Sequence, residues 1–307
     1  MTPAVEISGL HKQYGSRVAL RGIDVRVDPG TVVGFVGPNG AGKTTAMRIL
    51  LDVLRPTSGQ VRVLGEDPRA GGARLRARIG YLPGELRLDG RHDVASLLDH
   101  FVEISHARHV PRHDARAAWR DLADRIGLDP TRRVRGLSKG NKQKVGLVQA
   151  FVHRPELLIL DEPTSGLDPL VQAEFLAMVR EVRDEGRTVF LSSHVLSEVE
   201  QAADSVVVLR EGRVVLTSGV DAVRAQLGQR VHLTLSGRVE AAPFLPLDGV
   251  RGATAAPAGA NTRLTLDLDG TPDAALRLAT THTVLAIDAE RPDLEAAVMS
   301  LYAKESR

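Results

Sequence analysis

The sequence predicts an α/β fold with a mostly parallel sheet, followed by a smaller α+β domain. Three observations support this prediction: buried-strand patterns that alternate with helical ones, a glycine-rich loop set between a strand and a helix, and a change of pattern after about residue 225. Hydrophobic residues make up 43% of the 307 residues and charged residues 25%, as in an ordinary globular protein. A chain of this length holds one large domain and a small one.

Composition excludes several classes of protein. The chain has no cysteine, so disulfides and thiolate metal sites are excluded. Its N-terminus lacks the charged-then-apolar order of a signal peptide, and no apolar run approaches the ~20 residues of a membrane-spanning helix. Arginines are scattered among acidic residues at a net charge of +2, which favours a solvated mixed-charge surface over a nucleic-acid face. We therefore expect a chain that does not itself cross a membrane and that has no nucleic-acid partner.

The N-terminal part predicts short strands and one strand–loop–helix unit. Alternating apolar residues predict strands within 4–30. A turn signal at 28–30 then leads into the mostly apolar run 31–36, which predicts a buried strand. The helical pattern that follows has one apolar face, formed by Met47, Leu50, Leu51 and Leu54.

The loop between this strand and this helix, residues 37–44 (the P-loop), has the sequence GPNGAGKT and fits the phosphate-binding consensus G-x-x-x-x-G-K-[ST]. Glycines let its N–H groups converge on phosphate oxygens, and the helix that begins near Gly42 adds the positive end of its dipole. Lys43 is placed to reach the β- and γ-phosphates, and the Thr44 hydroxyl to bind Mg²⁺. The expected nucleotide-binding residues here are Gly37, Pro38, Asn39, Gly40, Ala41, Gly42, Lys43, Thr44 and Thr45. A chance match is the alternative, and the strand–loop–helix context favours binding of a nucleoside triphosphate.

The middle of the chain predicts a helical region and then the rest of the sheet. Residues 85–135 are mostly helical in pattern, with an apolar face at Leu97, Leu98, Phe101 and Ile104. Further on, continuous apolar runs flank a helical pattern, which predicts a βαβ unit whose strands are buried on both faces. The other expected elements are a break at 55–59, a strand at 60–64, strands at 157–160 and 188–191, and a helix at 170–184.

Two acids follow the apolar run 157–160 directly. In a P-loop ATPase the acid at the tip of such a strand helps to hold Mg²⁺, so we expect Asp161 to share the metal with Thr44. The next acid, Glu162, is placed to polarise the attacking water. The alternative is that Glu162 only caps the turn that follows, and the presence of the P-loop favours the catalytic interpretation.

Residues 137–141 (the signature loop), with the sequence LSKGN, precede a helical pattern at 142–151. They resemble the LSGGQ-like motif of the ATP-binding cassette (ABC) ATPases, with Lys139 in place of a glycine and Asn141 in place of a glutamine. The resemblance implies that Ser138 and Gly140 act in trans, donating from a helix N-terminus to the γ-phosphate held by another subunit's P-loop. It therefore implies a dimer, a homodimer or a pair with a paralogue, with two nucleotides at its seam. An ordinary helix cap by Ser138 is the alternative.

Further positions match the family in order, and the resemblance covers residues 4 to about 220. Tyr14 matches the aromatic ring that stacks on adenine, and His194 matches the histidine that senses the γ-phosphate. The loop that crosses the dimer seam (the dimer loop) is matched by Ser165, Gly166, Leu167 and Asp168. The chain departs from the family at Gly84, where a glutamine usually touches Mg²⁺ or the lytic water. Either the Glu85 side chain takes the place of this glutamine, or water fills that place, or the coupling of the ATPase to its transmembrane partner works differently.

The resemblance implies an ABC ATPase domain over residues 1–225, with a β subdomain and a helical subdomain at about 85–150. Residues 230–307 predict a small α+β accessory domain, in which 241–262 are rich in Ala, Pro and Gly and show little pattern. Apolar residues alternate at Val231, Leu233 and Leu235 and at Leu264, Leu266 and Leu268, and a last helix from Pro292 has an apolar face of Leu294, Ala297, Val298 and Leu301.

By this resemblance the chain uses ATP and Mg²⁺ and energises a separate integral-membrane permease from the cytoplasmic face of the cell membrane, as a peripheral subunit. Its C-terminal domain resembles that of bacterial drug- and antibiotic-export ATPases, which implies export of a drug-like, lipid or peptide substrate. One alternative is a soluble ABC-type ATPase that acts on nucleic acid or ribosomes. Another is a regulatory ATP-binding module that does not turn over, to which Gly84 gives some weight.

Overall fold

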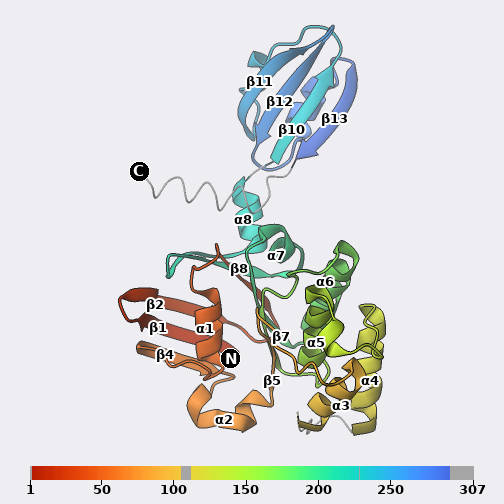
Figure 1. The fold of residues 1–307 in the computed structure, drawn as a ribbon. Helices are drawn as coiled ribbons and strands as arrows, with labels where there is room; N and C mark the ends of the chain where they lie inside the picture. The colour runs from red at the N-terminus through yellow and green to blue at the C-terminus, as the bar shows by residue number, and fades with distance from the viewer. Residues whose placement is uncertain (1, 105–111, 228, 291–307) are drawn as a thin grey trace. The chain divides into compact units, whose positions relative to one another are not determined.

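The computed structural model describes residues 2–104, 112–227 and 229–290. The chain divides into two compact units, Met1–Thr217 and Ser218–Arg307, which are seen in Figure 1. The division falls before helix α8 (Val220–Leu227). That helix therefore belongs to the second unit, whereas the sequence interpretation ended the first domain at residue 225.

The first unit contains two sheets and the helices that cover them. Its strands are β1 (Val5–Tyr14), β2 (Arg17–Val27), β3 (Val32–Val36), β4 (Ser58–Val63), β5 (Ile79–Leu82), β6 (Leu157–Asp161), β7 (Thr188–Ser193), β8 (Ser205–Arg210) and β9 (Arg213–Gly219). Its α-helices are α1 (Lys43–Leu50), α2 (Pro68–Arg76), α3 (Val94–Ile104), α4 (Arg112–Arg125), α5 (Lys139–Phe151), α6 (Pro169–Asp184) and α7 (Leu196–Ala202), with a 3₁₀ turn at Val134–Gly136.

The central sheet has the order β5-β6-β7-β3-β8-β9. The neighbours β5–β6, β6–β7, β7–β3 and β3–β8 are parallel. Every residue of β3, β6 and β7 is buried, which is why these strands are continuous apolar runs in the sequence rather than alternating ones. Because parallel strands end at the same edge of a sheet, the segments that follow β3, β6 and β7 meet there.

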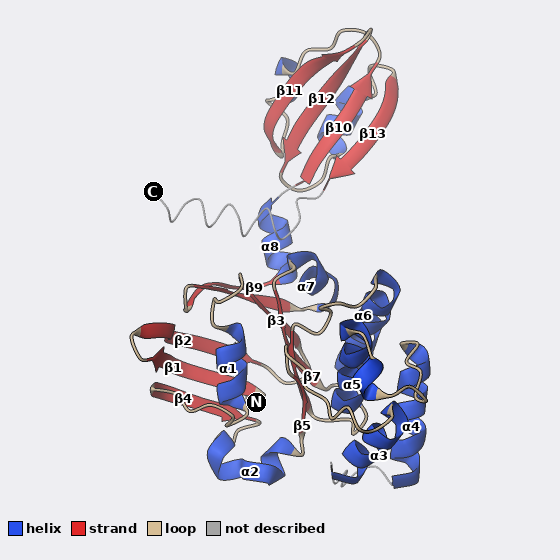
Figure 2. Cartoon of the chain, in the orientation of Figure 1, coloured by secondary structure: helices blue, strands red, loops and turns tan. Residues whose placement is uncertain are grey.

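A second sheet, β2-β1-β4, is antiparallel. Helix α1 contacts β2 and β4 on one side and β6 of the central sheet on the other, and Figure 2 shows it between the two sheets. Apolar residues of both sheets and α1 form one core, so the P-loop at the start of α1 is held between two rigid layers.

Helices α3, α4 and α5 pack against one another. The indole of Trp119 is buried here, and its Nε1–H donates to Asp99 Oδ1 at 3.0 Å. Two details of the sequence prediction were wrong. Ile104 is 61% exposed, because the buried face of α3 is centred on Val94, Leu98 and Val102 and Ile104 lies at its margin. Helix α5 begins at Lys139 rather than at residue 142, since Ser138 caps it.

The second unit is a four-stranded antiparallel sheet of order β11-β12-β10-β13 with one helix packed on it. Its elements after α8 are β10 (Gln229–Leu235), a 3₁₀ turn (Ala242–Phe244), β11 (Val250–Ala258), β12 (Asn261–Leu268), α9 (Asp273–Ala279) and β13 (Val284–Glu290). The alternating apolar residues noted in the sequence of β10 and β12 form its core, together with Phe244 and α9, which the sequence analysis did not predict.

Strand β11 lies within the segment 241–262, where the sequence showed little pattern. It is an edge strand that pairs with β12 through its backbone, and its Ala255, Ala256 and Ala258 are exposed. No apolar alternation marks it, because its core-facing side contributes only the partly buried Val250 and Ala253. The helix expected from Pro292 lies outside the described residues. In the part of the chain that the structure describes, no helix combines the length and the apolar character needed to span a bilayer.

Candidate active site

The P-loop, Glu162 and His194 meet at the edge of the central sheet where β3, β6 and β7 end. A pocket of about 360 Å³ lies there. Its lining residues are Tyr14, Arg17, Ala19, Asn39, Gly40, Ala41, Gly42, Lys43, Thr44, Thr45 and Glu162. The structure therefore brings the expected P-loop residues 39–45, Tyr14 and the expected base to one cavity.

The backbone of the P-loop depends on its glycines. Gly42 has φ 114°, a conformation that residues with a side chain rarely adopt. A Cβ on Gly37 would lie 2.2 Å from the Leu209 carbonyl oxygen. Gly42 is also the N-cap of α1 and has no side chain with which to satisfy the first N–H groups of that helix. These groups are thus available to an anion.

Lys43 is a buried cation between the P-loop and Glu162. Its side chain is 6% exposed, and its Nζ donates to the Gly37 carbonyl oxygen at 2.5 Å. Nζ lies 3.2 Å from Glu162 Oε1, as an ion pair rather than a hydrogen bond. A buried ammonium held by the Gly37 and Pro38 carbonyls and one carboxylate is well suited to bind phosphate oxygens.

Asp161 is completely buried at the end of β6. Its Oδ1 accepts a hydrogen bond from Ser192 Oγ at 2.7 Å, whereas Oδ2 has no hydrogen-bond partner among the described residues. Burial and the charge of Asp161 raise the pKa of the nearby Tyr81 hydroxyl. A buried carboxylate oxygen without a partner fits a cation ligand, so Asp161 and the Thr44 hydroxyl suit the Mg²⁺ expected here.

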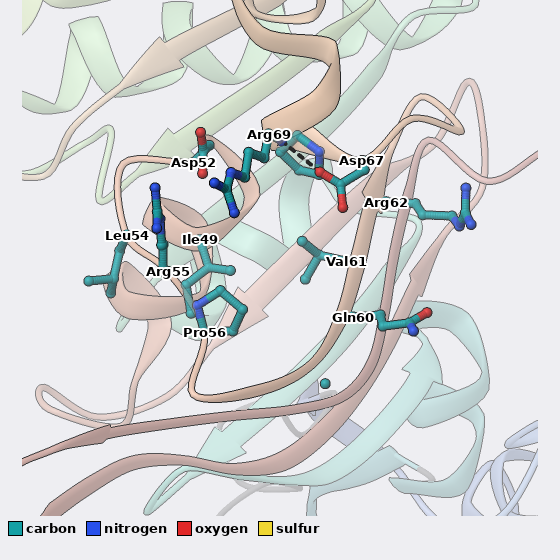
Figure 3. A pocket seen from close by; sticks show the side chains of 12 residues that line it. Ile49, Asp52, Leu54, Arg55, Pro56, Gln60, Val61, Arg62, Asp67 and Arg69 are labelled. Carbon is teal, nitrogen blue, oxygen red and sulfur yellow. Dashed lines mark hydrogen bonds between the residues drawn. The ribbon is translucent and has the colours of Figure 1, made fainter.

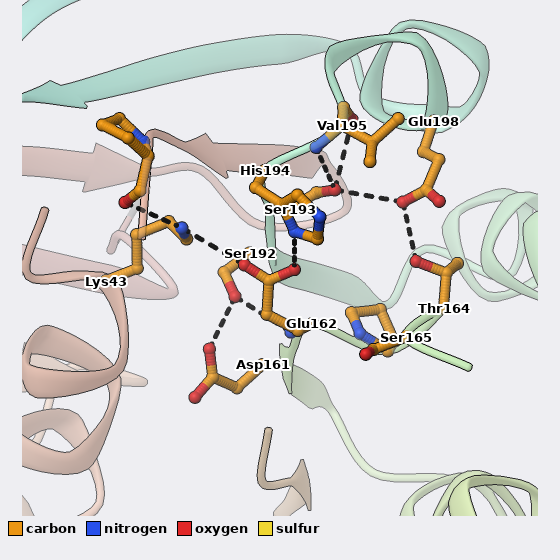
Figure 4. A network of polar contacts seen from close by, with 12 residues as sticks. Lys43, Asp161, Glu162, Thr164, Ser165, Ser192, Ser193, His194, Val195 and Glu198 are labelled. Atoms are coloured by element: carbon orange, nitrogen blue, oxygen red, sulfur yellow. Dashed lines mark hydrogen bonds and ion pairs between the residues drawn. The ribbon is translucent and has the colours of Figure 1, made fainter. Parts of the chain in front are cut away.

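Glu162 and His194 contact each other directly, as Figure 4 shows. Glu162 Oε2 lies 2.5 Å from Nδ1 of His194. Because a carboxylate only accepts, Nδ1 carries the proton that is shared in this contact. Glu162 also has φ 51°, an uncommon backbone conformation for a residue with a side chain. The acid that the sequence identified as the base is thus held against both Lys43 and His194.

Ser138 and Gly140 are not among the residues that line this pocket. Ser138 caps α5 by accepting from the Asn141 N–H at 3.3 Å. The signature loop instead lies against the dimer loop of the same chain: a Cβ on Gly140 would be 2.3 Å from the Gly166 carbonyl oxygen. Lys139 Nζ donates to Ser165 Oγ at 3.0 Å and joins the same two loops.

The dimer loop leads directly into helix α6. Asp168 caps that helix by accepting from the Val171 N–H at 3.0 Å, and Leu167 is buried. Glu198 on α7 accepts from Thr164 Oγ1 at 2.7 Å and from Ser193 Oγ at 3.0 Å. This contact links the start of the dimer loop to the end of β7.

At Gly84 an added Cβ would lie 3.2 Å from Asp161 Oδ2. The position is therefore beside the expected metal ligand although glycine offers it no side-chain oxygen. Glu85 is exposed, and nothing in the contacts of the described residues places its carboxylate at Asp161. Of the three options for this departure, the shift of Glu85 into the site thus finds no support in the structure.

Sequence reasoning missed four side chains at or beside the site: Arg17, Gln143, Ser192 and Glu198. Arg17 lines the pocket that contains the P-loop residues. The other three hydrogen-bond to the segments that carry Asp161 and Glu162. Ser192 could have been found as a polar residue ending a buried strand. Arg17, Gln143 and Glu198 have no local sequence signal, because the segments that they contact lie elsewhere in the sequence.

A larger depression, of about 460 Å³, lies in the same unit between α1, β4 and α2 (Figure 3). Arg55, Arg62 and Arg69 line it together with Asp52 and Asp67. None of the residues of the sequence motifs contributes to it.

Comparison with known proteins agrees with the motifs. The family model of the ABC transporter matches residues 20–165. The daunorubicin resistance ATP-binding protein DrrA3 of Streptomyces coeruleorubidus is 39% identical over 253 residues, which cover 80% of this chain and 79% of that protein. The bacitracin transport ATP-binding protein BcrA of Bacillus licheniformis is 34% identical, over 78% of either chain.

Among solved structures, an ATP-binding subunit of an ABC transporter aligns with a TM-score of 0.66 at 28% identity, covering 73% of this chain and 92% of that one. The dimeric cassette MJ0796 bound to ADP and Pi has a TM-score of 0.64 at 19% identity, covering 70% and 98%. Fold and site together define a P-loop ATPase of the ATP-binding cassette class. The chain belongs to the ATP-binding proteins of ABC transporters, and this membership implies ATP hydrolysis.

Proposed function

We propose that this chain hydrolyses ATP as a dimer and thereby drives a separate membrane-spanning permease that exports a drug-like, lipid or peptide compound. The observation that carries the proposal is the contact of Glu162 with both Lys43 and His194 at the end of the P-loop pocket. This contact supports the proposed roles of Glu162 as the base, Lys43 as the phosphate-binding cation and His194 as the γ-phosphate sensor.

Binding of ATP uses groups that the pocket presents. Tyr14 is 46% exposed, and its ring, with the Lys12 ammonium 4.9 Å from the ring centre, offers a face for the adenine base. Backbone N–H groups at the start of α1 and Lys43 Nζ take the phosphates. Thr44 and Asp161 would hold Mg²⁺, which neutralises charge on the phosphates when bound.

Catalysis by the chain consists of positioning and proton transfer. When Lys43 turns to the phosphates, Glu162 loses its cation and is left to accept a proton from the attacking water. His194, held through Nδ1 by Glu162, keeps that carboxylate in place beside the γ-phosphate. Most of the rate enhancement then comes from fixed charges and donors around the transferred group.

The signature loop completes a partner's site rather than its own. Ser138 and Gly140 are absent from the lining of the pocket in their own chain, and a pair of chains related by a two-fold axis places each signature loop on the partner's nucleotide. The relative MJ0796 is dimeric in its complex with ADP and Pi, which supports this arrangement.

Transport is the role that the relatives favour. DrrA3 and BcrA are ATP-binding proteins of daunorubicin resistance and bacitracin transport. We therefore place the chain as a peripheral subunit at the cytoplasmic face of the membrane, bound to its permease. A neighbouring gene that encodes about six apolar spans would identify that permease.

The test compares Glu162→Gln with the control Glu240→Gln, which makes the same change at an exposed glutamate of the second unit. Glu162→Gln is expected to slow ATP turnover about 10²–10⁴-fold, which is about 3–5 kcal/mol of barrier, and to leave nucleotide binding intact. Near-normal turnover in Glu162→Gln would overturn the assignment of the base. Transport is tested separately, by daunorubicin accumulation in cells that express the chain with its permease. Accumulation that does not differ between wild type and Glu162→Gln would overturn export of this class of compound while leaving the ATPase assignment in place.

A further inference from the structure

We propose that Gln143 is a positioning residue: it fixes the backbone of Glu162 and links it to the signature loop of the same chain. This inference rests on the proposed function, in which Glu162 is the base and the signature loop engages the partner's nucleotide. It adds a route by which one ATP site of the dimer affects the other.

The backbone of Glu162 needs external support. Its φ of 51° lies in the left-handed region, which only a few non-glycine residues of the described chain adopt. Such a conformation is strained for a residue with a Cβ and persists only where the surroundings impose it. Strain of this kind at a base indicates that its neighbours set the direction of its carboxylate.

Two side chains supply that support from opposite sides. The N–H of Glu162 donates to Ser192 Oγ at 3.0 Å. Its carbonyl oxygen accepts from Gln143 Nε2 at 3.1 Å, and the same Nε2 donates to the Pro163 carbonyl oxygen at 3.0 Å. Both backbone polar groups of Glu162 are therefore held by side chains, one from β7 and one from α5, and its carbonyl oxygen also accepts from the Ser165 N–H at 3.2 Å.

Gln143 is suited to this role because it is buried and rigid. It is 3% exposed, and the two N–H bonds of its amide are directed to two consecutive carbonyl groups. Loss of these donors would leave the Glu162 carbonyl with only the Ser165 N–H and the Pro163 carbonyl without the Gln143 amide, so the left-handed backbone of Glu162 would be less firmly held. The carboxylate would then move away from Lys43 and His194, and a displacement of about 1 Å at a reacting group costs on the order of 10²-fold in rate.

The same glutamine stands close to the signature loop. Helix α5 begins at Lys139, directly after its cap Ser138, and Gln143 lies just beyond its first turn. Lys139 and Gly140 also contact the dimer loop through Ser165 and Gly166. A movement of the signature loop onto the partner's γ-phosphate is thus transmitted along one short, rigid helix segment to the base of its own chain.

The experiment uses the full chain and three substitutions. Gln143→Met removes the donors but keeps length and helix propensity, and Gln143→Glu keeps the shape but places an acceptor against two carbonyls. Gln149→Leu, at a partly buried position of the same helix, is the matched control. Nucleotide titration, steady-state ATPase kinetics with a Hill coefficient, and thermal melting are measured for each.

We expect both Gln143 variants to bind ATP within about 2-fold of wild type and to lose about 10–100-fold in kcat, with a lowered Hill coefficient. Gln149→Leu should match wild type. The decisive readout is the double variant Gln143→Met with Glu162→Gln, in which the first change should reduce the residual rate no further, because its effect passes through Glu162.

Four outcomes would overturn the inference. The first two are a wild-type kcat in a folded Gln143 variant and a kcat that falls equally in Gln149→Leu. The third is a double variant whose kcat falls below that of Glu162→Gln by the same factor that Gln143→Met alone causes. The fourth is a reduced kcat with an unchanged Hill coefficient in the Gln143 variants. If Gln143→Met does not melt cooperatively, the same comparisons apply to Gln143→Glu. Failure of the proposed function is distinguishable, because it would appear as normal turnover in Glu162→Gln alone.

Discussion

The replacement of Gly140 by alanine tests whether each site is completed by the partner chain. A Cβ on Gly140 would lie 2.3 Å from the Gly166 carbonyl oxygen, whereas an ordinary C···O contact needs about 3.3 Å. The signature loop and the dimer loop must therefore separate by about 1 Å. A misplacement of this size costs on the order of 10²-fold in kcat, or about 2.7 kcal/mol of barrier.

The assay follows from the proposal that Gly140 and Lys43 act on different nucleotides of one dimer. Gly140→Ala should keep its own ATP affinity, because its P-loop is unchanged, and Lys43→Ala should keep a normal signature loop. A mixed dimer of the two variants contains one intact site, made of the P-loop of the first and the signature loop of the second. An equal mixture should then recover up to about a quarter of the wild-type rate, since half of the dimers are mixed and each has one good site.

Three measurements accompany this assay: turnover of each variant alone, turnover of the mixture, and recovery of mixed dimers through two different affinity tags. Melting temperatures near that of wild type show that Gly140→Ala still folds. A mixture that forms mixed dimers and remains as inactive as its parents would refute the reasoning. Loss of ATP affinity in Gly140→Ala would refute it as well, because that result would place Gly140 at its own chain's nucleotide.

Three other predictions concern the P-loop, the second unit and pH. Lys43→Ala should weaken ATP binding by at least about 10-fold in a nucleotide titration, and an unchanged affinity would contradict the assignment of the P-loop cation. Phe244→Ala should destabilise the second unit by about 3–5 kcal/mol, since this ring is fully buried there. Calorimetry of the full chain should show a lower melting temperature for the transition of the second unit and an unchanged one for the first unit. A shift of both transitions would contradict the prediction that the two units unfold independently. Burial lowers the pKa of His153, so the unfolded chain binds a proton at this residue more readily than the folded chain does, and the free energy of unfolding decreases as pH falls below the ordinary histidine value. His153→Gln should make this decrease smaller when the free energy of unfolding in urea is measured over that pH range. An unaltered dependence on pH would show that another group is responsible.

Much of the nucleotide site could be predicted from the sequence, because its chemistry lies in short contiguous segments. The P-loop needs only eight residues, 37–44, and its neighbours on either side predicted the strand and the helix that hold it. The apolar runs before Asp161 and Ser192 predicted parallel strands, and such strands place the segments after them at one edge. Strand β11 could not be predicted in this way, because its exposed alanines pair only through their backbone and leave no apolar pattern in the sequence.

What the sequence by itself determined is the identity of the chemical groups: a phosphate-binding loop, two acids after a buried strand, a histidine, and the family to which their order belongs. Only the tertiary structure decided how these groups are aimed. Glu162 has a left-handed backbone conformation, its carbonyl oxygen accepts from the Gln143 amide, and its N–H donates to the Ser192 hydroxyl. These contacts bring together residues from three separate elements. A motif records which side chains occur near one another along the chain, whereas hydrogen bonds between distant segments form only after helices and strands have packed, and these bonds set the direction in which the groups of the site point.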